Sequence, residues 1–178
     1  MSIGKSDLRL QACARRASLT PAQRGASATA LLQALRPWAT DRVAAYASTG
    51  DEPGTAQLLD VLDDVLLPVL LEDGDLDWAL HEGALVDGLR GTRQPPGPRL
   101  GRDALADCEV VVVPALGVDR AGTRLGRGGG SYDRALRHST GLTVAALHDG
   151  ELHEHLPAEP HDVPVDAAVL PGLGLVRL

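Results

Sequence analysis

The chain contains 178 residues, of which 44% are hydrophobic and 2% aromatic, and its formal net charge is −7. That length is enough for one domain with its own core, and we expect a single domain over residues 1–178. The negative charge argues against a protein that binds nucleic acids through a basic face. No apolar run approaches the length of a bilayer and the N-terminus lacks the apolar centre of a secretory signal, so we expect a cytoplasmic protein with no membrane partner.

The first predicted element is an amphipathic helix over residues 5–17. Lys5 and Arg9 are four positions apart and therefore lie on the same face of this helix. Both can reach one anionic ligand there, and a solvated basic face is the alternative interpretation. A hydroxyl residue followed by Pro21 is typical of a helix start, and we expect a second helix to about Leu35.

The next predicted element is a short strand from Val43 to Ala47, followed by a loop and another helix. Glu52 lies in this loop, between the strand and the helix. A carboxylate in such a place can accept hydrogen bonds from the N–H groups of a ligand. The alternative is an acidic residue that only stabilises the N-terminus of the following helix.

A further strand is expected from Val65 to Leu71, but Pro68 interrupts it. Proline cannot donate to a strand ladder, so the pattern favours an edge position or a bulge. Asp75 to Trp78 can begin an edge strand. Residues 83–101 are rich in Gly, Pro and Arg and predict a long irregular loop, of a length that is often functional.

The segment EVVVVPALGVDRAGTRLGRGGGSYDRAL, from Glu109 to Leu136, is the most informative part of the chain. Val110 to Val113 form a β-branched run that is typical of a buried strand, and Pro114 ends it. A glycine-rich loop follows, and then a possible helix from Ser131 to Arg137. A buried strand is also expected from Leu142 to Leu147.

The glycines of this loop allow backbone N–H groups to close on a phosphate, and a following helix start would add free N–H groups. Arg124 and Arg127 flank the glycines and can neutralise a polyphosphate, while Asp133 can hold a Mg²⁺ ion. A flexible turn is the alternative interpretation. The spacing matches neither of the two common nucleotide-binding fingerprints. The glycines are Gly126, Gly128, Gly129 and Gly130.

The stretch PALGVDRAGTRLGRGGGSYDR resembles the signature of the 5-formyltetrahydrofolate cyclo-ligase family, also called methenyltetrahydrofolate synthetase. The family pattern is approximately P-G-L-A/G-F-D-x-x-G-x-R-L-G-x-G-x-G-Y-Y-D-R. The chain departs from it at Ala115, Val118 and Ser131. The N-terminal K-x-x-L-R of the family matches the segment that begins at Lys5, and E-P-G-T at Glu52 is similar to a family motif whose glutamate binds the pterin.

The resemblance implies ATP and Mg²⁺ as cofactors and assigns roles to individual residues. Contacts with ATP are implied for Lys5, Arg9, Arg124, Leu125, Gly126, Arg127, Gly128, Gly129, Gly130, Ser131 and Tyr132. Contacts with the folate are implied for Glu52, Arg127, Gly128, Gly129, Gly130 and Ser131. Catalytic roles are implied for Arg124, Arg127 and Asp133. The long loop at residues 83–101 is expected to line the folate pocket.

The C-terminal stretch PAEPHDVPVD resembles the closing motif of the same family, which implies that Asp162 holds Mg²⁺ together with Asp133. Two hard oxygen ligands from separate segments suit this ion. His148, His153 and His155 invite a second metal interpretation, which we reject because no matching ligand spacing accompanies them. Asp166, at the end of the stretch, is expected to be a structural cap.

Strands that alternate with helices predict an α/β fold, namely a Rossmann-like three-layer sandwich with a mostly parallel central sheet. Ligands of such sheets bind at the carboxyl ends of the strands. The resemblance implies a monomeric enzyme that closes 5-formyltetrahydrofolate to 5,10-methenyltetrahydrofolate with ATP. Two alternatives remain open: a non-catalytic nucleotide- or RNA-associated relative with the same fold, and an ATP-dependent ligase for another acyl substrate.

Overall fold

The structure, a computed structural model, describes residues 4–38 and 40–178. The helices are α1 (Lys5–Ala17), α2 (Pro21–Leu35), α3 (Ala56–Leu59) and α4 (Ser131–Ala135), with 3₁₀ turns η1 (Arg36–Trp38), η2 (Leu89–Gly91), η3 (Arg102–Asp107) and η4 (Leu136–His138). The strands are β1 (Arg42–Ala44), β2 (Asp64–Leu70), β3 (Leu76–Leu80), β4 (Val86–Asp87), β5 (Arg93–Gln94), β6 (Val110–Pro114), β7 (Gly117–Asp119), β8 (Arg124–Leu125), β9 (Leu142–Ala146), β10 (Leu152–His153), β11 (Ala167–Leu170) and β12 (Gly174–Arg177).

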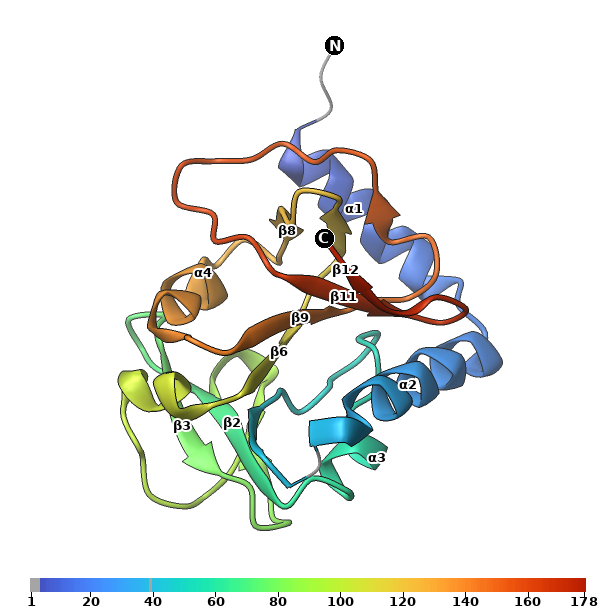
Figure 1. Cartoon of the computed structure of the whole chain (residues 1–178). Coiled ribbons are helices and arrows are strands. Elements are labelled where there is room, and N and C mark those ends of the chain that lie inside the picture. The colour runs from blue at the N-terminus through green and yellow to red at the C-terminus, as the bar shows by residue number, and fades with distance from the viewer. Residues whose placement is uncertain (1–3, 39) are drawn as a thin grey trace.

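A central sheet runs through the middle of the molecule (Figure 1). Over the described residues it has seven strands in the order β12-β11-β9-β6-β1-β2-β3. The pairs from β11 through β9, β6 and β1 to β2 are parallel, and only the two outermost strands, β12 and β3, pair antiparallel. The predicted mostly parallel sheet is therefore confirmed, and β3 is the edge strand that the sequence indicated.

The apolar side chains of the sheet alternate between two faces, and each face packs against its own layer. Val110 and Val112 of β6 belong to the cluster that contains the buried side chains of α2 and α3. Val111 and Val113 point the other way, into the cluster that contains residues of η3, α4 and η4. The continuous apolar run of β6 thus supplies both faces, as expected of a strand that is covered on both sides. The three-layer sandwich is confirmed.

The first two helices lie close to their predicted bounds. In α2 the Thr20 hydroxyl accepts from the Gln23 N–H and the Gln23 side chain accepts from the Thr20 N–H, so a reciprocal capping box precedes Pro21. Helix α1 packs Ala12 against a small apolar cluster with Leu116 of the segment after β6. Among the described residues, no helix is long and apolar enough to cross a membrane.

Pro68 lies inside the sheet, which corrects the predicted edge position. Strand β2 is flanked by β1 and β3, and Pro68 is opposite Trp78 of β3. The pairing of β2 with β1 ends at Ala44 and Leu66, where the Ala45 N–H donates to the Leu66 carbonyl at 2.9 Å. The Pro68 nitrogen faces the same side as that carbonyl, where the next bond of the ladder would form, so its missing N–H falls at the position where the pairing of β2 with β1 ends.

Other predicted elements are shorter or more structured than expected. Strand β1 ends at Ala44, and the helix after the Glu52 loop has four residues. The helix predicted from Ser131 divides into α4 and the 3₁₀ turn η4. The long loop at 83–101 contains a small antiparallel hairpin of β4 and β5. Strands β7, β8 and β10 form a small second sheet beside the segment that follows β6.

Candidate active site

A cavity of about 770 Å³ opens at the carboxyl ends of the central strands. Its floor contains Tyr46 after β1, Leu70 at the end of β2 and Ala115 after β6. The glycine loop, the N-terminal half of α1 and the β4–β5 hairpin line it as well. This volume is typical of ligand pockets, and the place is where parallel sheets bind their ligands. The cavity therefore lies where we expect the site from the sequence.

The cavity has a cationic lining although the whole chain carries a net negative charge. Nine Lys or Arg residues line it, against four Asp or Glu residues. A concave surface with an excess of one charge concentrates ligands of the opposite charge. The lining therefore favours the binding of one or two anionic ligands.

The glycine loop needs its glycines for backbone conformation and for space. Gly128 has φ +100° and Gly130 has φ +68°, values that side chains other than glycine rarely adopt. A Cβ on Gly126 would lie 2.7 Å from the Arg124 guanidinium. Because α4 has only five residues, its helix dipole is weak. The N–H groups that could bind a phosphate therefore come mainly from the backbone of the glycine loop.

Arg124 projects from β8 into this loop and is almost completely buried. One Nη donates to the Asp133 carboxylate at 3.1 Å, and the guanidinium carbon lies 5.7 Å from the centroid of the Tyr132 ring. The Nε group of Arg124 is buried and has no hydrogen-bond partner among the described residues. Buried donors are normally satisfied, so this unpaired N–H is an exception within the site. Burial raises the pKa of Tyr132, with a smaller contribution from Glu52, so its hydroxyl stays neutral.

Helix α1 presents its first two turns to the cavity. Arg9 Nε donates to the Gly126 carbonyl at 2.8 Å, and its guanidinium lies against Gly128. Lys5 Nζ contacts Asp162 at 2.6 Å and Glu159 at 3.2 Å. Burial alone would lower the pKa of Lys5, but the hydrogen bonds to the two carboxylates outweigh it and raise the pKa, so the ammonium group stays charged. Both basic residues that the sequence indicated on this helix face reach the pocket.

Glu52 lies in the loop after β1 with its two carboxylate oxygens in different surroundings. Oε2 accepts from the Thr49 N–H at 2.8 Å and from the Thr49 hydroxyl at 3.3 Å. Oε1 lies 3.9 Å from Arg127 Nε, and Arg127 also pairs with Asp51 at 2.8 Å. One oxygen is thus held by the loop and the other faces the cavity. Arg127 links the glycine loop to the loop of Glu52.

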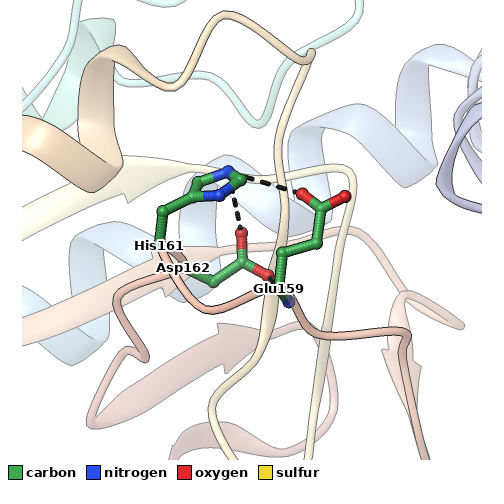
Figure 2. Close-up of side chains that lie close together, drawn as sticks. All are labelled: Glu159, His161 and Asp162. Carbon is green, nitrogen blue, oxygen red and sulfur yellow. Dashed lines mark hydrogen bonds and ion pairs between the residues drawn. The ribbon is translucent and has the colours of Figure 1, made fainter.

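A second acidic group lies near the N-terminus of α1. The carboxylates of Glu159 and Asp162 converge with the His161 ring, and their potential ligand atoms lie within 4.8 Å of one another (Figure 2). Asp133 is close to this segment, because its Oδ1 accepts from the Val163 N–H at 3.3 Å. Burial would raise the pKa of Asp162, but the hydrogen bonds from Lys5 and the Glu159 N–H lower it.

The structure brings nearly all predicted site residues into one cavity. Leu125 is the exception: its side chain is buried in the apolar cluster with α1, and its carbonyl accepts from the Leu116 N–H. The three histidines occupy different surroundings. His148 is buried and bonded to Ser27, and His155 is exposed.

Two ion pairs of the site were not indicated by the sequence. Arg16 lines the cavity as part of a buried ion pair with Glu151, and Asp51 holds Arg127. Their partners lie far along the chain, so no local pattern could reveal them. Arg134 and Arg137, which follow the glycine loop in the chain, also line the cavity.

The fold and the pocket define the class, an α/β protein of Rossmann-like architecture with a cationic cavity at the end of its sheet. Within this class the chain belongs to the 5-formyltetrahydrofolate cyclo-ligase family, whose family model matches residues 2–171. It is 40% identical, over 98% of its length and 97% of the relative's, to the 5-formyltetrahydrofolate cyclo-ligase of Mycolicibacterium smegmatis. It is 41% identical to the Escherichia coli K12 cyclo-ligase over 38% of each chain.

Solved structures agree with this assignment. The NMR structure of Aquifex aeolicus 5,10-methenyltetrahydrofolate synthetase superposes with a TM-score of 0.83 at 26% identity, covering 98% of this chain and 92% of the other. The synthetase from Mycoplasma pneumoniae gives a TM-score of 0.74 at 18% identity, covering 94% and 98%, which supports the fold. The resemblance of the glycine-loop signature to this family is therefore confirmed.

Proposed function

We propose that the protein closes 5-formyltetrahydrofolate to 5,10-methenyltetrahydrofolate and converts ATP to ADP and phosphate in the same reaction. The observation that carries the proposal is one cationic cavity that gathers α1, the Glu52 loop, the glycine loop and the Asp162 segment. These parts come from distant positions in the chain. Their convergence is explained if a large anionic ligand and a second substrate bind in the same cavity. Membership of the family supports the same reaction.

The chemistry explains why such a site needs cations more than a nucleophile. The formyl oxygen of the substrate is a poor leaving group, and transfer of the γ-phosphoryl group of ATP to this oxygen makes it a good one. N10 then attacks the activated carbon, and phosphate leaves. Phosphoryl transfer depends mainly on positioning and on neutralising charge. Guanidinium and ammonium groups that surround the reacting oxygens are therefore the main requirement.

The pocket offers these groups in two parts. We assign the ATP phosphates to Lys5, Arg9 and the glycine loop, because the basic side chains of α1 lie directly over that loop. The guanidinium of Arg124 lies against Gly126 of the same loop and is assigned to the transferred phosphoryl group. We assign the pterin to Glu52, whose Oε1 is free to accept from ring N–H groups.

The donor chemistry of the site also fits Mg²⁺. Asp133 and Asp162 both line the cavity, and the Val163 N–H joins the backbone beside Asp162 to the Asp133 carboxylate. We propose that these two carboxylates hold the ion, with Glu159 close enough to assist. A bound Mg²⁺ would neutralise phosphate charge and fix the orientation of ATP. In the structure the carboxylates of Asp133 and Asp162 pair with Arg124 and Lys5 instead.

All residues that line the cavity belong to one chain, so we also propose that a monomer is sufficient for activity. The test is the absorbance of methenyltetrahydrofolate when the purified protein meets 5-formyltetrahydrofolate and MgATP. We expect the signal to require both substrates. Folded protein that produces no signal would remove the proposal and leave a non-catalytic relative, while ATP consumption with another acyl substrate alone would indicate a different ligase.

A further inference from the structure

His148 lies behind the cavity wall, and its ring contacts the backbone of the loop that carries Glu52. The residue follows β9 in the chain and is 1% exposed. Its Nε2 atom lies 2.9 Å from the carbonyl oxygen of Asp51, the residue before Glu52. Its Nδ1 atom lies 2.7 Å from the hydroxyl of Ser27 in α2. The ring therefore bridges α2 and the Glu52 loop.

The two contacts determine which ring nitrogen carries the proton. A carbonyl oxygen can only accept a hydrogen bond, so Nε2 is protonated and donates to Asp51. Burial lowers the pKa of His148, so the ring is neutral at pH 7 and Nδ1 is an acceptor. The Ser27 hydroxyl donates to Nδ1 at 2.7 Å, which is shorter than its 3.3 Å contact with the Gln23 carbonyl. Ser27 thus stabilises the tautomer that can bind the Asp51 carbonyl.

The Glu52 loop has an internal shape that is set by its own hydrogen bonds. The Tyr46 hydroxyl donates to the Pro53 carbonyl at 2.7 Å. Ser48 and Thr55 each donate a backbone N–H to the hydroxyl of the other at 3.0 Å. Because these bonds join residues of the same loop, they shape it without fixing its position relative to the cavity.

Asp51 ties this loop to other parts of the chain in two ways. Its carboxylate pairs with Arg127 of the glycine loop at 2.8 Å, and the Arg127 side chain is 56% exposed. Its carbonyl accepts from His148, and both His148 and Ser27 are buried. A ligand can displace the exposed pair, but the bond to His148 lies outside its reach. The buried bond therefore persists when the cavity is filled.

From this geometry we propose that His148 is a positioning residue for the folate substrate, because it places Glu52 through the Asp51 carbonyl. The inference rests on the proposed function, in which Oε1 of Glu52 accepts from the pterin ring. Hydrogen bonds weaken steeply with distance and angle, so a shift of the Asp51 peptide would weaken this contact. The binding of MgATP, assigned to α1 and the glycine loop, does not depend on the same placement.

The test is calorimetric titration of 5-formyltetrahydrofolate and of MgATP, each alone. His148→Leu should lower the folate affinity by about three- to tenfold, the effect of one lost hydrogen bond, and change the MgATP affinity by less than about twofold. His148→Gln, whose amide N–H can replace Nε2–H, should retain most of the folate affinity. The matched control is His153→Leu, because His153 lies against Gly117 outside the cavity, and it should bind like the wild type.

A double-mutant cycle with Glu52 separates positioning from a general loosening of the fold. Glu52→Gln keeps an oxygen for the Thr49 N–H and removes the charge, so it should lower the folate affinity by about tenfold or more. If His148 acts through Glu52, His148→Leu should cost less than about twofold in the Glu52→Gln background. The same loss in both backgrounds would overturn the inference.

Ser27→Ala supplies a milder variant that decides the question if His148→Leu does not fold. It removes the donor to Nδ1, so the tautomer that cannot donate to Asp51 gains population, and the folate affinity should fall by about two- to fivefold. Wild-type folate affinity in Ser27→Ala, or equal weakening of both ligands, would overturn the inference.

The outcomes also distinguish this inference from the proposed function. If Glu52→Gln lowers the folate affinity and His148→Leu does not, the role of His148 is wrong and the pterin assignment stands. If Glu52→Gln binds folate like the wild type, the pterin assignment and the inference are both wrong. A protein that shows the expected coupling but makes no methenyl product would contradict the proposed reaction and leave the role of His148 standing.

Discussion

The two ends of helix α1 are held by ion pairs of different kinds. At the C-terminal end Arg16 donates to both oxygens of Glu151, at 2.7 and 2.8 Å, and both side chains are buried. At the N-terminal end Lys5 contacts Asp162 and Glu159 at the edge of the cavity. Both side chains of the first pair are buried from solvent, whereas the second pair is partly exposed at the edge of the space that a ligand would fill.

The buried pair belongs to a network that we call the anchor, consisting of Arg16, Glu151, His148 and Ser27. Arg16 also donates to the Ala115 carbonyl, and Glu151 accepts from the His148 N–H at 2.9 Å. The His148 ring contacts the Ser27 hydroxyl at 2.7 Å and the Asp51 carbonyl at 2.9 Å. The anchor thus joins the helix that carries Lys5 to the loop that carries Glu52.

The other end, which we call the exchangeable end, consists of Lys5, Arg9, Glu159 and Asp162. Its charges can leave their present partners for phosphates or a metal ion, because the partners border the cavity. Fully satisfied buried networks give rigidity, whereas partly exposed pairs contribute little to stability. Helix α1 is thus fixed at its C-terminal end, and this leaves the side chains at its N-terminal end able to bind a ligand.

Glu151→Gln should produce the largest loss of stability. It leaves the Arg16 guanidinium buried without a counter-charge, which typically costs about 3–5 kcal/mol of the free energy of unfolding. Urea denaturation measures this. Glu154→Gln, at an exposed pair with Arg120, is the matched control and should leave the stability unchanged. The double variant Arg16→Met, Glu151→Leu should lose less than Glu151→Gln alone, and a larger loss would contradict the role of the buried charge.

Lys5→Met should affect ligand binding and leave the fold nearly intact. Loss of a charge-assisted contact typically costs about 1.5–3 kcal/mol, so the affinity for MgATP should fall by about ten- to a hundredfold. Calorimetric titration of MgATP measures it, and Lys5→Arg, which keeps the charge, should retain part of the affinity. If Lys5→Met destabilised the fold as much as Glu151→Gln, the distinction between the two ends would fail.

Asp133→Asn and Asp162→Asn test whether Asp162 of the exchangeable end and the nearby Asp133 hold a metal ion together. If both carboxylates bind one Mg²⁺, the second loss matters less once the first has broken the site, and the coupling between them should be about 0.5–3 kcal/mol. The measurements are Mg²⁺ binding by calorimetry and turnover against Mg²⁺ concentration for the single and double variants. Additive effects would show that the two carboxylates do not share one ion. Unchanged Mg²⁺ dependence in a single variant would exclude the substituted residue from the metal site.

Much of the fold could be predicted because its signals are local. The Val110–Val113 run identified a strand that is buried on both faces, and the residues before Pro21 identified a capped helix. The placement of Pro68 was wrong because it depends on where β1 ends relative to β2, and that register is a tertiary property. Strands as short as β7 and β8 give no periodic signal at all.

The candidate site also contains residues that the local sequence indicated and residues that it did not. Three of the four residues of the exchangeable end were predicted, because Lys5 and Arg9 share a helix face and Asp162 lies in a motif that resembles the family. The anchor was not predicted, because Arg16 and Glu151 are separated by 135 positions and nothing in the local sequence of either marks its partner. Buried pairs of this kind become visible only when the chain has folded.

The smallest expected effect is the response of the anchor to pH. Burial lowers the pKa of His148 below its usual 6.5, and the charges of Arg16 and Arg24 act in the same direction against the hydrogen bond to Asp51 and the charge of Glu151. The unfolded chain therefore binds this proton more readily than the folded protein. The contribution of His148 to the free energy of unfolding is therefore fully present above about pH 6.5. It decreases as the pH falls below this value, until the histidine of the folded protein is itself protonated.

The slope of the free energy of unfolding should reach at most about 1.4 kcal/mol per pH unit for this one proton. Denaturation between pH 7.5 and 5.5 measures it, and His148→Gln should flatten the profile. His153 also has a pKa lowered by burial, so His153→Gln separates its share. Lys5, with a raised pKa, and Asp162, with a lowered one, stay charged throughout this range. Lys5→Met should therefore keep the wild-type slope, and a flattened slope in that variant would show that both ends of α1 respond to pH.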